Sequence, residues 1–273
     1  FVRVTESVLP NRTFLRTCPE LLHDSRTDAG TPMRVQLLGS DPHFMAANAR
    51  RLVKHRPAGV DINFGCPAPT VFRHRGGSAL LGEPDLLHAI VSAVRAEVPA
   101  DIPFTAKMRL GIADSSLAVD CAQAIEAGGV DELIVHGRTK VDGYKPPARW
   151  AQIDRVRAAV GIPIIANGEV WTVADFRQCQ QESGCADIML GRGALADPPE
   201  GKGKPDKAVK AEKSEKAEKA EKGGKGHKSA SQDSGGTALA SAGISISLAR
   251  QYAQDARLDF GAYKPLPPGI RKN

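Results

Sequence analysis

Short polar clusters recur in this sequence of 273 residues, each at the point where an apolar, strand-like run ends. Side chains of these types can hold a phosphorylated ligand, stabilise negative charge and move a proton. Each cluster alone has an ordinary structural explanation, such as a turn-capping asparagine or a satisfied core histidine. Five in succession instead indicate a site. They are Asn63-Phe64-Gly65-Cys66-Pro67, Lys107-Met108-Arg109, His136-Gly137-Arg138, Asn167-Gly168-Glu169 and Gly191-Arg192-Gly193.

Cys66 is the candidate for proton chemistry. A free cysteine is most often a small buried hydrophobic residue, and that alternative stays open here. However, Gly65 allows close approach of the backbone to a ligand, and Pro67 fixes the turn that follows. A thiol with an ordinary pKa of about 8.5 is mostly protonated at neutral pH, so it can donate a proton.

The glycines near residue 191 allow two interpretations. The run from Gly191 to Ala196 matches the G-x-G-x-x-A fingerprint of dinucleotide-binding folds. That fingerprint belongs to the first strand of its fold, whereas here it follows the last one, and no strand-borne acid follows it. Backbone N–H groups after the last strands of an α/β barrel commonly bind phosphate. We therefore expect a phosphorylated cofactor at this point, with Arg192 as the countercharge.

Other classes of site and location find little support. The five cysteines form no C-x-x-C pair, and neither H-E-x-x-H nor G-x-S-x-G occurs, so we expect no metal site and no serine nucleophile. Cys179 and Cys185 flank a predicted helix end and are interpreted as packing residues. No apolar run approaches the roughly 18 residues of a membrane span, and the N-terminus lacks a signal-peptide pattern. We expect a reduced, cytoplasmic protein that does not bind membranes.

The elements that must position these clusters alternate regularly. Apolar runs predict strands at 35–38, 60–64, 103–108, 132–136, 162–166 and 187–190, and residues 1–5 indicate a seventh. Helical patterns lie between them, for example at 84–98 and at 172–183, where Thr172 and Asp175 are spaced as a capping box and Gly184 ends the helix. This alternation predicts a parallel sheet. The fold expected is an α/β TIM (β/α)8 barrel that lacks its first strand, which we expect to precede residue 1.

The composition divides the sequence into three segments. Residues 1–199 form the expected barrel domain. Residues 200–236 are a Lys/Glu/Ala-rich insertion or linker, in which 201–228 carry ten lysines and five acids and so supply five of the six net positive charges. Lysine at every third position leaves no apolar helix face, so this segment is expected to be disordered. Residues 237–273, with a predicted helix at 244–258, are interpreted as the remnant of a C-terminal helical region.

Taken together, the motifs resemble those of the tRNA-dihydrouridine synthases, in order and spacing over residues 1–198. The residues that carry the resemblance are Val35-Gln36-Leu37-Leu38-Gly39, Asp61 to Pro67, Lys107 to Gly111, Val135 to Thr139, Ala166 to Glu169 and Met189 to Gly193. Phe1 to Val4 and Lys140 to Tyr144 look most like the subgroup that modifies uridine 16 in the D-loop. The resemblance implies reduction of a uridine of tRNA to 5,6-dihydrouridine, with FMN as cofactor and NADPH as electron donor. Separately, we expect a monomer.

The resemblance also assigns roles to residues. Cys66 would protonate C5 of the uracil while C6 receives a hydride. Contacts to tRNA would come from Arg3, Asn63 and Tyr144. The residues that would hold FMN are Gln36, Lys107, His136, Asn167, Gly168, Glu169, Gly191 and Arg192.

Two alternatives remain open at this point. Another FMN-dependent barrel could oxidise or reduce a free pyrimidine, as a dihydroorotate dehydrogenase does. A flavin-less RNA-binding remnant could instead use the lysine-rich segment for non-specific contact. The sequence also departs from the family at Pro69 and Phe72, which stand where relatives usually have polar residues.

Overall fold

The computed structural model describes residues 1–196, so the insertion at 200–236, the segment 237–273 and the helix predicted at 244–258 lie outside the described residues. Within them, seven strands form one parallel sheet in the order of the sequence, β1-β2-β3-β4-β5-β6-β7. The predicted parallel α/β arrangement is thereby confirmed. The strands are β1 (Val2–Arg3), β2 (Val35–Leu38), β3 (Val60–Phe64), β4 (Phe104–Arg109), β5 (Glu132–His136), β6 (Ile164–Asn167) and β7 (Ile188–Met189).

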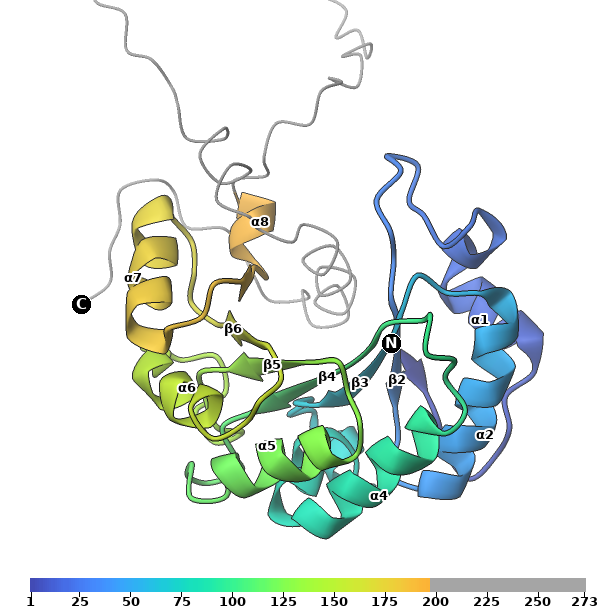
Figure 1. Ribbon diagram of the computed structural model, residues 1–273, viewed down its shortest axis with the longest axis horizontal. Coiled ribbons are helices and arrows are strands. Elements are labelled where there is room, and N and C mark those ends of the chain that lie inside the picture. Colours follow the sequence, from blue (N-terminus) through green and yellow to red (C-terminus); the bar gives the residue numbers. More distant parts are fainter. Residues whose placement is uncertain (197–273) are drawn as a thin grey trace, which may run out of the picture.

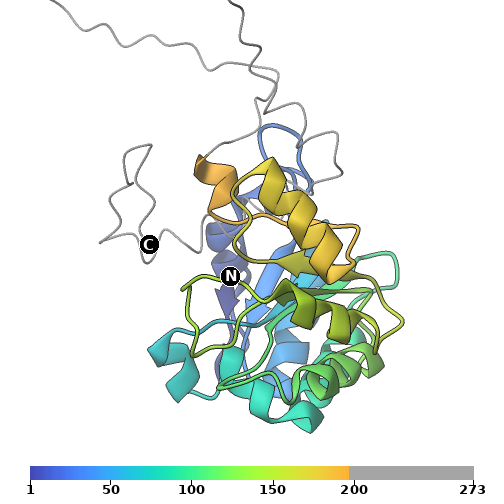
Figure 2. The same cartoon turned by 90° about the vertical axis from the view of Figure 1, so that its left-hand side faces the viewer.

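Helices α2, α4, α5, α6 and α7 lie along the outer side of this curved sheet (Figure 1). Helix α2 packs on α4, α4 on α5, and α6 on α7. Figure 2 shows α5, α6 and α7 one above the other on the same side of the sheet. The α-helices are α1 (Asn11–Thr17), α2 (Pro42–Leu52), α3 (Pro69–Arg73), α4 (Pro84–Arg95), α5 (Ala118–Ala127), α6 (Trp150–Arg157), α7 (Val173–Ser183) and α8 (Gly193–Ala196), with short 3-10 helices η1 (Pro19–Leu22), η2 (Val53–His55) and η3 (Gly77–Gly82).

The two faces of the sheet differ in chemistry, because successive residues of a strand point to opposite faces. The outer face is apolar and packs against the helices as the main core; from β3, for example, it presents Val60, Ile62 and Phe64. The inner face holds a small separate apolar cluster of Ile134, Ile165 and Met189. The rest of that face is largely polar, which is what a binding site requires.

Element boundaries follow local chemistry. Strand β4 begins at Phe104 and β6 at Ile164, one and two residues after the predicted starts, and each directly follows a proline. Proline has no N–H to give to the sheet, so regular pairing begins after it. The capping box of Thr172 and Asp175 is confirmed, as is Gly184 at the end of α7 with φ 64°. Among residues 1–196, no helix has the length and apolar character needed to cross a bilayer.

Candidate functional site

The predicted cofactor residues of the strands share the inner face of the sheet. Register pairs Asn63 with Lys107, and His136 with both Arg109 and Asn167, so these side chains point to one side. Gln36 pairs with Asp61 and lies on the same side. All of these side chains are buried. The tertiary structure thus brings Gln36, Lys107, His136 and Asn167 together at one face.

Cys66 lies just past the end of β3, on a loop that is held from two directions. The backbone N–H groups of Gly65 and Cys66 both donate to Oδ1 of Asn63, each at 2.9 Å. The carbonyl of Cys66 accepts from the N–H of Ser78 at 3.0 Å and from its Oγ at 2.9 Å. The other four cysteines are buried, whereas Cys66 is only partly so. The predicted packing role of Cys179 and Cys185 agrees with that burial.

His136 lies among cations. Burial lowers the pKa of His136 well below its usual value, and the charges of Lys107, Arg109, Arg138 and Arg192 lower it further. Its Nε2 is 3.3 Å from Nη1 of Arg138. Because an arginine can only donate, Nε2 must accept, which places the ring proton on Nδ1. His136 is therefore a neutral imidazole with a fixed tautomer.

Glu169 is bound to neighbouring side chains of the protein. Nη2 of Arg138 forms an ion pair with Oε2 of Glu169, and Nε1 of Trp171 donates to Oε1 at 3.0 Å. Glu169 adopts φ 58°, which is uncommon for a residue with a side chain. Gly168 before it has φ 118°, and a Cβ there would lie 2.9 Å from the ring of His136. This turn therefore needs a glycine at 168 and places Glu169 beside Arg138.

The segment after β7 contains a glycine followed by an arginine, Gly191 and Arg192. A Cβ atom on Gly191 would meet nothing within 4 Å, so its backbone faces open space. The guanidinium of Arg192 lies 5.3 Å from the ring of Tyr144 and 5.1 Å from that of Trp171. A glycine backbone with open space before it and an arginine beside it fits a phosphate group. The residues present thus fit the phosphorylated cofactor expected from the sequence.

Tyr144 belongs to the loop between β5 and α6 and is half exposed, at 52%. Arg109 holds this loop, since its Nη1 donates to the carbonyls of Thr139 at 2.9 Å and Gly143 at 2.8 Å. The guanidinium of Arg109 also lies 5.2 Å from the ring of Tyr144. Arg109 of β4 and Arg192 of the segment after β7 therefore flank one exposed aromatic ring.

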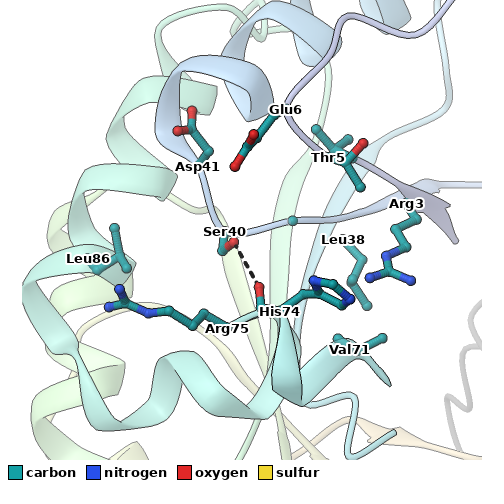
Figure 3. A pocket seen from close by; sticks show the side chains of 13 residues that line it. Arg3, Thr5, Glu6, Leu38, Ser40, Asp41, Val71, His74, Arg75 and Leu86 are labelled. Atoms are coloured by element: carbon teal, nitrogen blue, oxygen red, sulfur yellow. Dashed lines mark hydrogen bonds between the residues drawn. The ribbon is translucent and has the colours of Figure 1, made fainter. Parts of the chain in front are cut away.

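Arg3 lies elsewhere on the rim of the sheet. It lines a pocket of about 780 Å³ at the carboxyl ends of β1 and β2, together with His74 and Arg75 (Figure 3). The pocket also contains the acids Glu6 and Asp41, so its charge is mixed. Neither Cys66 nor any of the predicted cofactor residues is among its lining residues.

Sequence reasoning gave no role to several residues that support this site. Arg109 and Arg138 stood in the polar clusters, yet their structural links to Tyr144 and Glu169 were not anticipated. Asp61 was detectable, because it precedes Asn63 by two residues and must share its face of the strand. No local pattern connects Ser78 with Cys66, since twelve residues separate them. Within residues 1–196, no three His, Cys, Asp or Glu side chains gather as they would around a metal ion.

Fold and site together define a parallel α/β protein whose buried polar side chains gather on the inner face of its sheet. The family model described as Dihydrouridine synthase (Dus) matches residues 1–235. The chain belongs to this family.

Curated relatives agree with the family. The chain is 57% identical over 198 residues to a tRNA-dihydrouridine(16) synthase of Cupriavidus necator, an alignment that covers 72% of this chain and 62% of the relative. It is 56% identical to proteins of the same name from Ralstonia nicotianae and Aquipseudomonas alcaligenes, of which it covers 61% and 63%. The chain thus spans somewhat less than two thirds of the length of these relatives. A solved mandelate racemase/muconate lactonizing enzyme from Sulfitobacter is similar at 17% identity, with a TM-score of 0.43 over 56% of this chain and 36% of that one.

Proposed function

We propose that this protein is a tRNA-dihydrouridine synthase that reduces uridine 16 of the D-loop, with FMN as cofactor and NADPH as electron donor. Family membership supports the reaction class, and the names of the relatives support the position. The observation that carries the proposal is the placement of Cys66. It is the one cysteine of the five that is not buried, and it follows the end of β3, next to the polar inner face that carries Gln36, Lys107, His136 and Asn167.

FMN, when bound, supplies the hydride that reduces the uracil ring. We assign its binding to the inner-face and rim residues. Lys107 is the buried cation that would stabilise negative charge on the reduced ring system, and Arg192 with the backbone of Gly191 would hold the phosphate. Neutral His136 would donate to the cofactor through Nδ1 and adds no charge of its own. The complete proposed set is Gln36, Lys107, His136, Asn167, Gly168, Glu169, Gly191 and Arg192.

Cys66 would move the second hydrogen. Addition of hydride to C6 leaves negative charge toward C5, and the thiol proton of Cys66 transfers from Sγ to C5 to complete the product. The two backbone hydrogen bonds to Asn63 and the two from Ser78 fix the position of this residue before substrate arrives. Such preorganisation is the protein's contribution to the rate.

Binding of tRNA would use residues at the rim. The target base must leave its stack, which costs a few kcal/mol and is easiest in a loosened loop such as the D-loop. Half-exposed Tyr144, flanked by two arginines, offers a ring on which a base can stack. We assign contacts to tRNA to Arg3, Asn63 and Tyr144, of which buried Asn63 acts chiefly by holding the Cys66 loop.

The wider organisation follows from the same proposal. Seven parallel strands in sequence order support a TIM-barrel fold for this protein. Residues 1–199 would be its catalytic domain, 200–236 an insertion and 237–273 part of a helical tRNA-binding region. We further propose a cytoplasmic monomer.

The test is direct. Purified intact protein should show the visible absorption of a bound flavin, and with NADPH it should convert an unmodified tRNA transcript so that nucleoside mass spectrometry detects dihydrouridine. Replacing uridine 16 of the transcript by cytidine should abolish the product. A colourless protein that binds RNA would contradict the proposal, as would a flavoprotein that reduces free pyrimidines and leaves tRNA unchanged.

A further inference from the structure

A series of hydrogen bonds, buried at its inner end, links the interior of the sheet to the Cys66 loop. Asp61 is 1% exposed and accepts from Nε2 of Gln36 at 2.6 Å and from Oγ1 of Thr105 at 2.7 Å. Oε1 of Gln36 accepts from Nδ2 of Asn63 at 2.8 Å. Oδ1 of Asn63 then accepts from the N–H groups of Gly65 and Cys66. Asp61 is thus connected to Cys66 through two amide side chains.

The donor-to-acceptor direction of these hydrogen bonds is set by the groups at the two ends of the series. An ionised carboxylate can only accept, so the group of Gln36 that faces Asp61 must be its amide nitrogen. The oxygen of Gln36 then faces Asn63 and requires the nitrogen of Asn63 in return. That leaves the oxygen of Asn63 for the two backbone N–H groups, which need an acceptor. If both amides were reversed, nitrogen would face these N–H groups and neither would be satisfied.

We propose that Asp61 is a positioning residue for Cys66, because it holds the amides of Gln36 and Asn63 in the one orientation that anchors the loop carrying the thiol. The proposal rests on the proposed function, in which Cys66 is the proton donor. Stability does not explain the carboxylate, since burial penalises its charged form and raises the pKa of Asp61 to about 6. The carboxylate is instead the shared acceptor of Gln36 and Thr105, so its contribution lies in the hydrogen bonds that it organises.

Two valine variants separate the hydrogen bond between Asp61 and Gln36 from the other hydrogen bond that Asp61 accepts, from Thr105. Asp61→Val keeps a branched side chain and removes the acceptor that Gln36 requires. Thr105→Val is the matched control, because it breaks the other hydrogen bond to the same carboxylate and leaves the link to Gln36 intact. Asp61→Asn is the conservative variant: its oxygen can still accept from Gln36 while its amide donates to the hydroxyl of Thr105.

The readout is the rate at which iodoacetamide alkylates Cys66 in the flavin-loaded protein, followed by peptide mass spectrometry. This rate needs neither tRNA nor reductant, and the other four thiols are buried. Asp61→Val should raise the rate about fivefold, the factor expected when one hydrogen bond of ordinary strength is lost. Thr105→Val and Asp61→Asn should stay within about twofold of the parent. Equal rates in Asp61→Val and Thr105→Val would overturn the proposal.

A second measurement does not depend on how well Asp61→Val folds. Hydrogen exchange of the Gly65 and Cys66 amides, compared between the parent and folded Asp61→Asn, should show protection retained or only slightly reduced. Loss of that protection in Thr105→Val but not in Asp61→Asn would mean that the Cys66 loop is held through Thr105 and not through Gln36. That result would contradict the proposed role of Asp61. The result is separate from the role of Cys66 in catalysis, because a Cys66→Ala protein with full activity would refute the proton donor and leave the alkylation result standing.

Discussion

Gly77 packs so closely against Cys66 that a Cβ atom on it would lie 2.8 Å from Cβ of Cys66 and 2.7 Å from its carbonyl oxygen. Gly77 also adopts φ 57° at the start of η3, a backbone conformation that favours glycine. The same segment supplies Ser78, which binds the carbonyl of Cys66. Residues that are remote in sequence from the β3 loop therefore shape the position of its thiol.

Gly77→Ala should displace Cys66 as well as destabilise the fold. The matched control is Gly143→Ala, because Gly143 has φ 58° and no atom within 4 Å of an added Cβ. Both variants carry the backbone strain of about 1 kcal/mol, and only Gly77→Ala adds the clash, typically another 1–3 kcal/mol. Urea unfolding should show the larger loss of stability for Gly77→Ala, accompanied by slower turnover of tRNA. Equal losses of stability in the two variants would show that the Cys66 loop moves to accommodate the added methyl group without loss of stability.

Cys66→Ala should separate the two halves of the reaction. The variant should bind FMN and be reduced by NADPH at the parental rate, because the sulfur is not assigned to flavin binding. Reoxidation of the flavin by tRNA should slow by about 10²–10⁴-fold, the usual contribution of general acid catalysis. Stopped-flow absorbance with unmodified tRNA gives both rates.

Cys179→Ala serves as the control for that experiment, since it removes a thiol from the packed core and leaves the site intact. It should lower stability and leave the reoxidation rate close to that of the parent. If Cys66→Ala reoxidised as fast as Cys179→Ala, Cys66 would be only a packing residue of the loop.

Asp61 should make stability depend on pH in the acid range. Its pKa rises from 3.8 to about 6 on folding, mainly through burial, although Gln36, Thr105, Arg34 and Lys107 all lower it. Between about pH 4 and pH 6 the folded protein therefore keeps this proton, whereas the unfolded chain has released it. Stability from this group is full below pH 4 and is lost as pH rises to about 6, a difference of about 3 kcal/mol.

Asp61→Asn tests that effect, because a neutral amide has no charged form to bury. The variant should gain up to about 3 kcal/mol relative to the parent between pH 4 and pH 7, measured as the difference between their urea unfolding curves. Asp114→Asn is a suitable control, since Asp114 is exposed and its pKa is lowered by bonds from Ser116. A difference between parent and Asp61→Asn that stays constant from pH 4 to pH 7 would refute the assignment.

The lysine-rich segment should add affinity for tRNA that does not depend on sequence. Residues 201–228 hold ten lysines and five acids, and cations near phosphates release counterions on binding. Replacing 201–236 by a Gly/Ser linker of equal length should reduce the slope of binding affinity against salt concentration and leave flavin reduction by NADPH unchanged. The measurement is tRNA binding over a range of salt concentrations. An unaltered slope would make the segment a solvated spacer.

The sequence by itself determined the arrangement of the fold and the polar clusters. Apolar runs alternating with amphipathic segments predicted every strand of the sheet within two residues, and Thr172, Asp175 and Gly184 marked both ends of α7. These features depend on neighbours three or four residues away, so local chemistry is sufficient to predict them. The face that each strand residue occupies also follows from the two-residue period of a strand.

Only the tertiary structure decided which of these residues meet. Gly77 and Ser78 reach Cys66 because the chain after α3 returns to the end of β3, and no periodicity predicts that return. Arg109 and Arg192 converge on Tyr144 from separate strand ends. The link from Asp61 through Gln36 to Asn63 required the register between β2 and β3. Such contacts depend on how distant segments pack, which is determined by the whole core and not by any single stretch of sequence.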